Sequence, residues 1–416
     1  MAARRLRLMR IGFLFNHDQI HQVAHSLPIA MVLAKTCPGV ETVVITTNER
    51  LDREVERLMA IVGGTRPKHV RLAHKSLFTR GAVHALECVI PAAKLAIYRD
   101  NLDFFRSFDA LVVAEKTTAL LKTRYGLHDL KLIHTRHGAG DRAVGFNNAS
   151  AAFDFVLVSG PKIRERLLAE TGLTEDRLAM VGYPKFDLLK PKMLPEKLRG
   201  NGRPTILYNP HVSPHLSSWY RDGRAVLDYF LNHPEYNLIF APHVMLFERK
   251  VAVSIDRMRL AFPGKVDHRY VDAPNIHVDL GSAASTDMSY TQAADIYLGD
   301  VSSQIYEFLR TPRPCIFLNS QGVTYQGDPN YLHWSAGQVL SGPSELDRAL
   351  ADATANPERY RAIQRRLFSE SIALELTPSS LRAAQAIMQY LWGNEAVPAG
   401  LPMHGVDADV AIGHAA

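Results

Sequence analysis

Short apolar segments rich in β-branched residues alternate, in the first half of the chain, with longer segments of helical period. The strand-like segments are 11–15, 42–45, 110–113, 131–133 and 155–158. Segments 24–35 and 52–61, which lie between them, have the apolar spacing of amphipathic helices. Apolar strands that are covered on both faces and joined by helical crossovers are typical of a mostly parallel, doubly wound sheet. The pattern therefore predicts an α/β fold.

The alternation begins again after segment 185–202, which is rich in Pro, Lys and Gly and is interpreted as a linker. Strand-like segments then follow at 205–208, 237–240, 276–278, 296–298 and 315–318, and helical patterns at 344–355, 358–369 and 379–392. A chain of 416 residues is longer than one hydrophobic core usually serves. We therefore predict two Rossmann-like domains, 1–190 and 203–375, with a ligand in a cleft beyond the carboxyl ends of the strands. The tail 393–416 is small, rich in Pro and Gly and unpatterned, and is predicted to be disordered.

Composition adds a mild positive charge and few cysteines. There are 48 basic and 42 acidic residues, and the net charge of +6 favours anionic substrates, phosphates or an acidic membrane surface rather than nucleic acid. Cys37, Cys88 and Cys315 are too far apart for a disulfide framework or a zinc knuckle, and they fit a reducing compartment. The start of the chain lacks the apolar region of a signal peptide, and no stretch has the apolar length to span a bilayer. The sequence thus predicts a cytoplasmic protein.

The first motif that could carry chemistry follows the predicted strand 131–133. This strand runs into a His-Gly turn, in which Gly138 would let the backbone approach a ligand. His137 stands at the end of the strand on the side of the cleft, where an imidazole can act as a general base. His134 faces the other way by strand alternation and is predicted to pack or to cap.

The second motif follows the predicted strand 296–298. Asp300 ends the strand, Ser302 and Ser303 follow, and a helical pattern begins. Hydroxyl groups beside the N–H groups of a helix N-terminus can hold a phosphate without lysine or metal. Glu307 would lie about one turn into that helix, where it could accept hydrogen bonds from ribose hydroxyls. An ordinary N-cap serine and a solvated glutamate remain the alternative interpretation.

Further polar residues follow the first two strands of the second half. His243 could donate to a donor phosphate and stabilise charge on the leaving group. Tyr208, Asn209 and His211 supply polar groups at the same rim. Lys185, in the turn that closes the first domain, could also reach the cleft.

The loop after the first strand contains three histidines and no glycine. A dinucleotide-binding oxidoreductase would have a glycine-rich fingerprint here, so this class is disfavoured. His17, His21 and His25 suit the binding of a neutral or anionic acceptor. Their spacing of four residues also suggests zinc, but neither a Cys nor a second group of ligands accompanies them, and we predict no metal site.

Taken in this order, the motifs resemble those of the CDP-glycerol glycerophosphotransferase family, the teichoic-acid-type transferases of GT-B architecture. The resemblance covers residues 131–318. The His-Gly turn at His137 matches a family motif, and segment 182–187 is similar to the family's Gly-Tyr-Pro-Arg-Asn-Asp. Tyr208-Asn209-Pro210 stands at its Tyr-Ala-Pro-Thr and Pro242-His243 at its Lys-x-His-Pro element. Segment 294–308 resembles the block that contains its Ser-Ser pair.

The resemblance implies two Rossmann-like doubly wound domains that face each other across a cleft, with the C-terminal helix 376–392 packing back toward the first domain. It implies that His137 is the catalytic base and that it looks across a gap at the serine-bearing turn. The implied donor contacts are Gly138, Lys185, Tyr208, Asn209, His211, His243, Asp300, Ser302, Ser303 and Glu307. The implied reaction is metal-independent transfer from a donor such as CDP-glycerol to a hydroxyl acceptor, in the synthesis of a cell-envelope polysaccharide.

Departures from the family leave the donor open. Lys185 replaces an arginine and loses its bidentate fork, and His211-Val212-Ser213 replaces a Thr-Trp-Arg element. A nucleotide-sugar glycosyltransferase is therefore one alternative. A nucleotide-sugar 2-epimerase of the same fold is another, although it usually needs acidic residues in the cleft. A non-catalytic nucleotide-binding protein is the third.

The expected partners are a nucleoside-diphosphate-linked donor and a hydroxyl acceptor, without cofactor or nucleic acid. Because teichoic-acid-type enzymes act on lipid-linked acceptors, the resemblance also implies a peripheral position at the inner face of the membrane. The sequence does not choose between membrane attachment and a free cytoplasmic protein.

Overall fold

The computed structural model describes residues 8–17, 20–73, 90–136, 138–142, 145–248, 251–254 and 259–393. By its contacts the chain divides into two compact units. Unit 1 comprises Met1–Gly138, Phe146–Leu188 and Ile372–Ala416, and unit 2 comprises Ala139–Gly145 and Leu189–Ser371.

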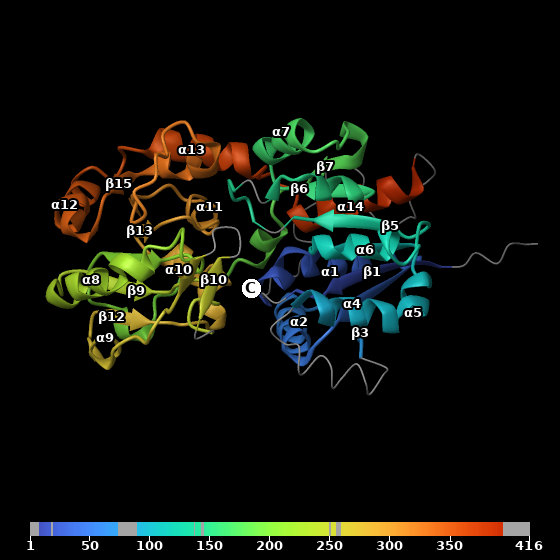
Figure 1. The fold of residues 1–416 in the computed structure, drawn as a ribbon, viewed down its shortest axis with the longest axis horizontal. Coiled ribbons are helices and arrows are strands. Elements are labelled where there is room, and N and C mark those ends of the chain that lie inside the picture. Colours follow the sequence, from blue (N-terminus) through green and yellow to red (C-terminus); the bar gives the residue numbers. More distant parts are fainter. Residues whose placement is uncertain are drawn as a thin grey trace, which may run out of the picture. The chain divides into compact units, whose positions relative to one another are not determined.

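Unit 1 is built, within the described residues, on a parallel seven-stranded sheet of order β3-β2-β1-β4-β5-β6-β7 (Figure 1). The strands are β1 (Met9–Phe15), β2 (Val40–Thr46), β3 (Lys68–Arg71), β4 (Ala110–Val113), β5 (Lys131–Thr135), β6 (Phe155–Val158) and β7 (Leu178–Met180). The five strands predicted in the first half are confirmed. β3 and β7 are short edge strands whose side chains are half-buried or exposed; β3 has a single aliphatic residue, and β7, although apolar, has only three residues.

Successive side chains of the central strands enter two buried clusters, one on each face of the sheet. Phe13 of β1 packs with α1, α2 and α14, and Leu14 packs with α4, α5 and α7 on the opposite face. The helices are α1 (Leu27–Thr36), α2 (Glu49–Val62), α4 (Ile90–Asp100), α5 (Leu102–Arg106), α6 (Leu120–Thr123), α7 (Pro161–Glu170) and α14 (Ser379–Trp392). Helices on both faces explain why the strands are apolar throughout, and they confirm the doubly wound fold of this unit.

Helix α14 comes from the end of the described chain and completes the core of unit 1. Ile387 and Met388 are fully buried in the same cluster as α1, and the ring of Tyr390 stacks on Phe155 with centroids 4.4 Å apart. Asp187 accepts hydrogen bonds from the backbone N–H groups of Ser379 and Ser380, at 3.3 and 2.6 Å, and so caps the start of α14.

The first residues of the predicted linker 185–202 belong to the folded core. Pro184–Leu188 form a 3₁₀-helix in unit 1, and Lys185 and Phe186 are buried. Leu198 is buried as well, in the short 3₁₀-helix Glu196–Leu198 of unit 2. Most of the residues from Lys190 to Gly202 are exposed, and the boundary between the two units, after Leu188, falls within the predicted linker.

Unit 2 contains, among the described residues, a parallel six-stranded sheet of order β12-β9-β8-β13-β14-β15. The strands are β8 (Thr205–Asn209), β9 (Asn237–Phe240), β12 (Ile276–Val278), β13 (Ile296–Gly299), β14 (Cys315–Leu318) and β15 (Gln338–Leu340). The five predicted strands are confirmed, and three-residue β15 has too few apolar positions to be recognised. The antiparallel pair β10 (Ala252–Ser254) and β11 (Arg259–Ala261) lies outside this sheet.

The helices of unit 2 surround its sheet and are of very different lengths. They are α8 (Trp219–Asn232), α9 (His268–Asp272), α10 (Ser289–Ala293), α11 (Ile305–Phe308), α12 (Leu346–Ala355) and α13 (Arg361–Ser371). A buried cluster joins Val226 and Phe230 of α8 and Leu350 of α12 to alternate residues of the strands. The predicted helices 344–355 and 358–369 are confirmed as α12 and α13.

Segment 139–145 differs from the sequence-based division, which placed it inside a first domain 1–190. Its contacts are those of unit 2, because the buried side chain of Asp141 bonds to Tyr306 and His333. The chain therefore passes from β5 of unit 1 into unit 2 and returns at Phe146.

Several predictions concern residues that the structure does not describe. His137, Cys88 and the tail from residue 394 lie outside the described residues.

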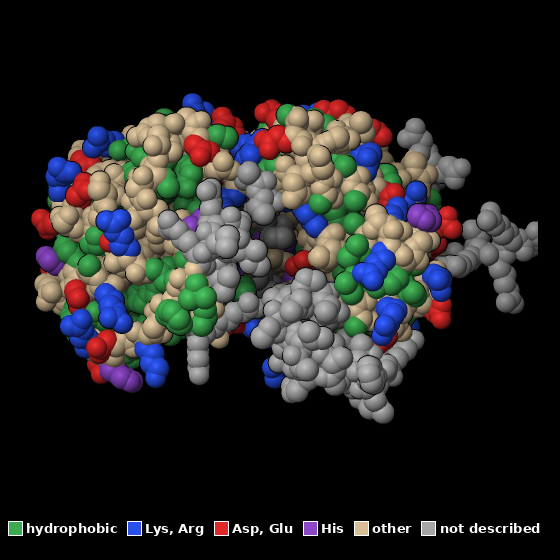
Figure 2. Space-filling view, in the orientation of Figure 1, with side chains coloured by type: hydrophobic (Ala, Val, Ile, Leu, Met, Phe, Trp, Pro, Cys, Tyr) green, Lys and Arg blue, Asp and Glu red, His purple; other side chains and the backbone are tan. Residues whose placement is uncertain are grey.

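Within the described part of the chain, no helix combines the length and apolarity that crossing a bilayer requires. On the face drawn in Figure 2, basic and acidic side chains are intermixed over both units, in keeping with the small net charge.

Candidate functional site

The strand order of unit 2 reverses between β8 and β13, and this reversal marks a candidate ligand site. From β8 the chain continues outward to β9 and β12, and from β13 it continues in the other direction to β14 and β15. Open α/β sheets bind ligands beyond the carboxyl ends of strands at such a point, where the two loops diverge and leave a crevice. The loops concerned begin at Pro210 and Asp300.

Asp300 ties these two loops together. Its carboxylate accepts hydrogen bonds from the backbone N–H groups of His211 and Ser218, at 2.9 and 2.6 Å, and from the Ser218 hydroxyl at 2.8 Å. The N–H of Val301 donates to the same group at 2.6 Å. Burial nevertheless raises the pKa of Asp300 to about 6. The predicted donor contact is therefore revised: Asp300 is fully buried and holds the loops behind the surface that a ligand would meet.

Two histidines lie side by side at this edge of unit 2. The rings of His211 and His243 have centroids 5.8 Å apart. Nδ1 of His211 accepts the N–H of Ser213 at 2.9 Å, and Nδ1 of His243 accepts the N–H of Met245 at 3.3 Å. Since an accepting nitrogen carries no proton, each neutral ring carries its proton on Nε2. The pair thus supplies two N–H groups with their tautomers fixed by the backbone.

Both histidines are held in the neutral form. Burial lowers the pKa of His243 to about 4. Burial also lowers the pKa of His211 well below its ordinary value, with further contributions from His243, Arg142 and His215. Neutral N–H donors beside an arginine suit phosphate oxygens, because they donate without adding a second cation to a crowded site.

The serines of the predicted phosphate cradle have a different local structure from that expected. Ser302 is half-buried and its Oγ accepts the N–H of Gln304 at 3.3 Å, whereas Ser303 is exposed. Helix α11 has only four residues, so it provides one turn rather than a long helix with a strong dipole. A methyl group added at Gly140 would lie 3.2 Å from Cβ of Ser303, which places the segment after the His-Gly turn against this serine.

Three other predicted donor contacts are buried within unit 2. The hydroxyl of Tyr208 bonds to Oγ of Ser218 at 2.9 Å, and Nδ2 of Asn209 donates to the carbonyl oxygen of Ala241 at 2.7 Å. Glu307 is buried in α11. Because Tyr208 and Asn209 end β8 inside the core, their contacts hold the loops that carry His211 and His243. The sequence pattern identified the correct strand end but could not show which way each side chain points.

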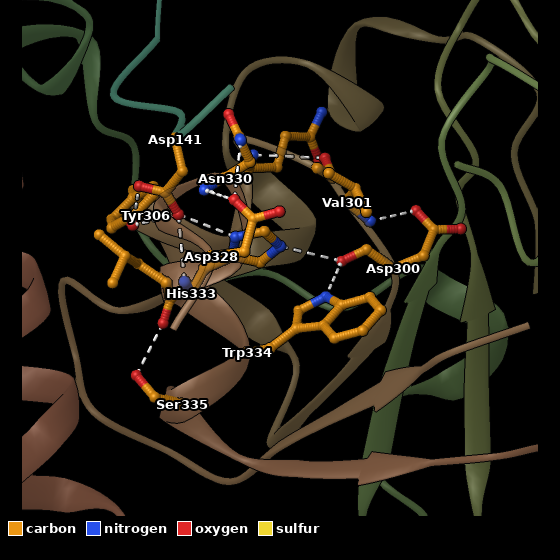
Figure 3. A network of polar contacts seen from close by, with 12 residues as sticks. Asp141, Asp300, Val301, Tyr306, Asp328, Asn330, His333, Trp334 and Ser335 are labelled. Carbon is orange, nitrogen blue, oxygen red and sulfur yellow. Dashed lines mark hydrogen bonds and ion pairs between the residues drawn. The ribbon is translucent and has the colours of Figure 1, made fainter. Parts of the chain in front are cut away.

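A network around Asp141 was not foreseen from the sequence (Figure 3). The Tyr306 hydroxyl donates to both carboxylate oxygens of Asp141, at 2.7 and 2.8 Å. His333 approaches the same carboxylate through its backbone N–H at 3.1 Å and through Nδ1 at 2.8 Å. Nε2 of His333 lies 3.2 Å from the carbonyl oxygen of Asp300, to which Nε1 of Trp334 also donates. Both nitrogens of His333 therefore face oxygen atoms, one of the Asp141 carboxylate and one of the Asp300 backbone.

This network fixes a basic residue that sequence reasoning missed. Arg142 directly follows Asp141 and lies close enough to His211 to help lower its pKa. His333 belongs to the 3₁₀-helix Pro329–Ala336, far from Asp141 in sequence, so no spacing rule could connect them. The only local signal was an Asp-Arg pair after a glycine-rich turn.

In unit 1 the strand order reverses between β1 and β4, and the predicted histidines follow β1. His17 and His25 are buried, and the ring of His25 meets that of Tyr183 edge-on at 5.0 Å. His21 and His25 lie in a 3₁₀-helix, Ile20–His25, with three residues per turn, so residues four apart do not stack as they would in an α-helix. Among the described residues, no group of three or more His, Cys, Asp and Glu side chains could hold a metal ion.

The His-Gly turn is described only in part. Gly138 has φ = 78°, a conformation that favours glycine. His134 is buried, as expected: it stacks on Phe153 at 4.5 Å, and its Nε2 lies 3.1 Å from the carbonyl oxygen of Ala114. Since His137 lies outside the described residues, its role as base and its closeness to Ser302 and Ser303 stay predictions. Lys185 lies in unit 1, where only 3% of its surface is exposed.

No family model and no curated protein matches the chain. Solved structures do match along nearly its whole length. A variant of the wall teichoic acid polymerase TagF soaked with CDPG is 14% identical, with a TM-score of 0.60, 92% of this chain and 89% of that chain covered. UDP-GlcNAc 2-epimerase from Neisseria meningitidis bound to UDP-GlcNAc is 12% identical, with a TM-score of 0.59 and coverages of 92% and 100%.

A putative UDP-N-acetylglucosamine 2-epimerase from Listeria monocytogenes is 12% identical, with a TM-score of 0.56 and coverages of 94% and 99%. Identities this low speak for the fold alone. Together with the two parallel sheets, they show that the chain has the GT-B fold of two Rossmann-like domains.

Proposed function

We propose that the chain is a metal-independent transferase that moves a glycerophosphate-type or glycosyl group from a nucleoside-diphosphate-linked donor to a hydroxyl acceptor. The observation that carries the proposal is the pair of neutral Nε2–H donors, His211 and His243, at the strand reversal of unit 2. Arg142 and the exposed Ser303 lie at the same edge. Support also comes from solved structures of this fold whose ligands are CDPG, UDP or UDP-GlcNAc.

In the proposed reaction, the acceptor oxygen attacks the donor centre and a new bond forms there. The bond from that centre to the nucleotide oxygen breaks, and the nucleotide leaves with the electron pair. His137 accepts the proton of the acceptor hydroxyl. His243 and Arg142 stabilise the charge that develops on the departing phosphate, a task that a divalent ion performs in other enzymes. The acceptor is proposed to bind to unit 1, where His17, His21 and His25 would contact it.

The proposal is tested by a thermal-shift screen against CDP-glycerol, CDP-ribitol, UDP-sugars and GDP-sugars. A true donor raises the unfolding temperature, because it binds the folded state and not the unfolded chain. The screen is repeated with and without EDTA. A protein that none of these compounds stabilises, or that needs a divalent ion for turnover of the donor it binds, would contradict the proposal. Full turnover by a His137→Ala protein would show that His137 is not the catalytic base.

The similarity to UDP-GlcNAc 2-epimerases favours one second candidate. An epimerase converts its nucleotide sugar without an acceptor. Incubation of the bound nucleotide sugar alone, followed by NMR of the sugar ring, separates the two activities. Inversion at C2 in the absence of acceptor would replace the transferase by the epimerase, and affinity without turnover under any condition would indicate a binding protein.

A further inference from the structure

Three basic side chains gather in unit 1 near the carboxyl ends of neighbouring strands. Lys116 follows β4 in the short 3₁₀-helix Lys116–Ala119, and Arg136 directly follows β5. Arg166 reaches the same place from α7, the helix after β6. β4, β5 and β6 are adjacent in the sheet, and the carboxyl edge of such strands is where α/β folds bind ligands. None of the three residues was among the predicted site residues.

Phe146 and Asn147 hold the three side chains together. The ring of Phe146 is buried, and the guanidinium carbons of Arg136 and Arg166 lie 4.5 and 3.9 Å from its centroid. Nζ of Lys116 donates a hydrogen bond to Oδ1 of Asn147 at 2.7 Å. Two guanidinium groups thus share one aromatic ring, and the amine is fixed by the next residue in the chain.

Each of these positive charges disfavours the charged form of its neighbour and so lowers the neighbour's pKa. The pKa of Lys116 is lowered to about 8, chiefly by burial and then by the charge of Arg136. Burial and the charge of Arg166 lower the pKa of Arg136 to about 10. Two carboxylates lie in the same region: Glu170 pairs with Arg166 at 2.8 Å, and Glu115, which precedes Lys116, lies 3.6 Å from Lys94. A bound anion would oppose these effects, because a negative charge favours the charged forms of Lys116 and Arg136.

We propose that Lys116, Arg136 and Arg166 form a binding site for a phosphate group of the acceptor. Arginine matches phosphate geometry with its planar fork, and lysine adds a compact charge. These residues belong to unit 1, whereas the proposed donor contacts His211 and His243 belong to unit 2, and the site assigns an acceptor class to the proposed transferase. The naming of the acceptor rests on that proposed function, whereas the binding of phosphate does not.

The test measures the titration of Lys116 itself. Competitive labelling with acetic anhydride, followed by mass spectrometry across pH 6–10 as the working range, yields a titration midpoint for each lysine. In the free protein we expect Lys116 to titrate near pH 8, below the ordinary lysine value of about 10.4. Inorganic phosphate and glycerol 3-phosphate should move this midpoint upward and slow the labelling, because a bound anion favours the charged amine. Glycerol should have no effect.

Variants separate this site from general charge effects. Arg136→Gln should raise the Lys116 midpoint without phosphate and weaken phosphate protection about tenfold, the effect of losing one charged hydrogen bond. Arg166→Gln should weaken protection similarly. The matched control is Arg164→Gln, which removes the same charge from the same helix. Arg164 pairs with Glu175 at 2.6 Å, as Arg166 pairs with Glu170 at 2.8 Å, but Arg166 is the one that lies over the Phe146 ring. Thermal unfolding of each variant checks that the fold persists.

The outcomes distinguish this inference from the donor proposal. A Lys116 midpoint that neither phosphate compound moves, or a loss of protection as large in Arg164→Gln as in Arg136→Gln, would overturn the phosphate site. His243→Ala should leave phosphate protection of Lys116 unchanged, since His243 belongs to unit 2. If no nucleotide stabilises the protein while phosphate still protects Lys116, the donor proposal fails and the phosphate site stands. Protection by inorganic phosphate but not by glycerol 3-phosphate would show a free-anion site and reject the acceptor.

Discussion

The imidazole of His243 is where the proposed donor chemistry can be measured on a single side chain. Because burial lowers its pKa to about 4, the ring is neutral at pH 7 and carries its proton on Nε2. We expect a histidine-ring NMR titration to show a midpoint near 4 for this residue, against about 6.5 for an ordinary histidine. A midpoint between 6 and 7 would show that burial does not lower the pKa of this ring.

Removal of the same ring should weaken nucleotide binding. A hydrogen bond to a charged phosphate contributes about 1.5–3 kcal/mol, so His243→Ala should lower the affinity for UDP or CDP about tenfold or more in calorimetry. The control is His233→Ala, at the C-cap of α8 in the same unit, where the ring stacks on Tyr229. Equal losses in the two variants would point to general destabilisation rather than to ligand contact.

The raised pKa of Asp300 predicts how the stability of the folded protein depends on pH. Its pKa is raised to about 6 in the folded state, above the ordinary carboxylate value, so the folded state holds the proton more tightly. Its contribution to stability is therefore fully present below pH 4 and is lost as the pH rises through 6, by about 3 kcal/mol. Asp300→Asn cannot titrate, so urea unfolding should show the wild type losing this amount relative to the variant between pH 4 and 7. Parallel curves would contradict the shift.

At the scale of elements, the bonds around Asp141 fasten a short segment to α11 and to the 3₁₀-helix Pro329–Ala336. Tyr306→Phe removes the hydroxyl that donates to the buried Asp141 carboxylate. The loss of this donor should lower the free energy of unfolding by about 1–3 kcal/mol. Hydrogen exchange at the backbone of residues 139–142 should then accelerate. Tyr270→Phe, which removes a similar bond to Asp228 at 2.8 Å, should leave that segment protected. Unchanged exchange in Tyr306→Phe would show that the segment is held by other contacts.

The strands and longer helices could be predicted because burial on both faces leaves continuous apolar runs such as 155–158. β3 could not, since charged residues fill an edge strand. For the candidate site, strand ends located His211 and His243, but the inward direction of Tyr208 and Asp300 depends on packing that no local pattern records. Asp141, Tyr306 and His333 meet through contacts between distant parts of the chain, and the cations around Phe146 do so as well.

For the whole molecule, the placement of α14 predicts the effect of truncation. A chain that ends at Ser371 would lack Ile387 and Met388, and the removal of two fully buried side chains of this size costs several kcal/mol. Calorimetry should then show unit 1 unfolding at a lower temperature, or not folding, while the transition of unit 2 persists. A chain that ends at Gly393 is the control and should unfold as the full chain does. Loss of both transitions together would show that the units fold as one.

The excursion of residues 139–145 from one unit into the other has a consequence for how this protein can be rebuilt. A genetic exchange of halves at a single point, such as between Leu188 and Leu189, would separate Tyr306 and His333 from the carboxylate to which they bond. Chimeras with other proteins of this fold would need to transplant that short peptide along with the C-terminal half. Inheritance of a matched peptide, rather than of an intact half, would decide which hybrids keep the bonds around Asp141.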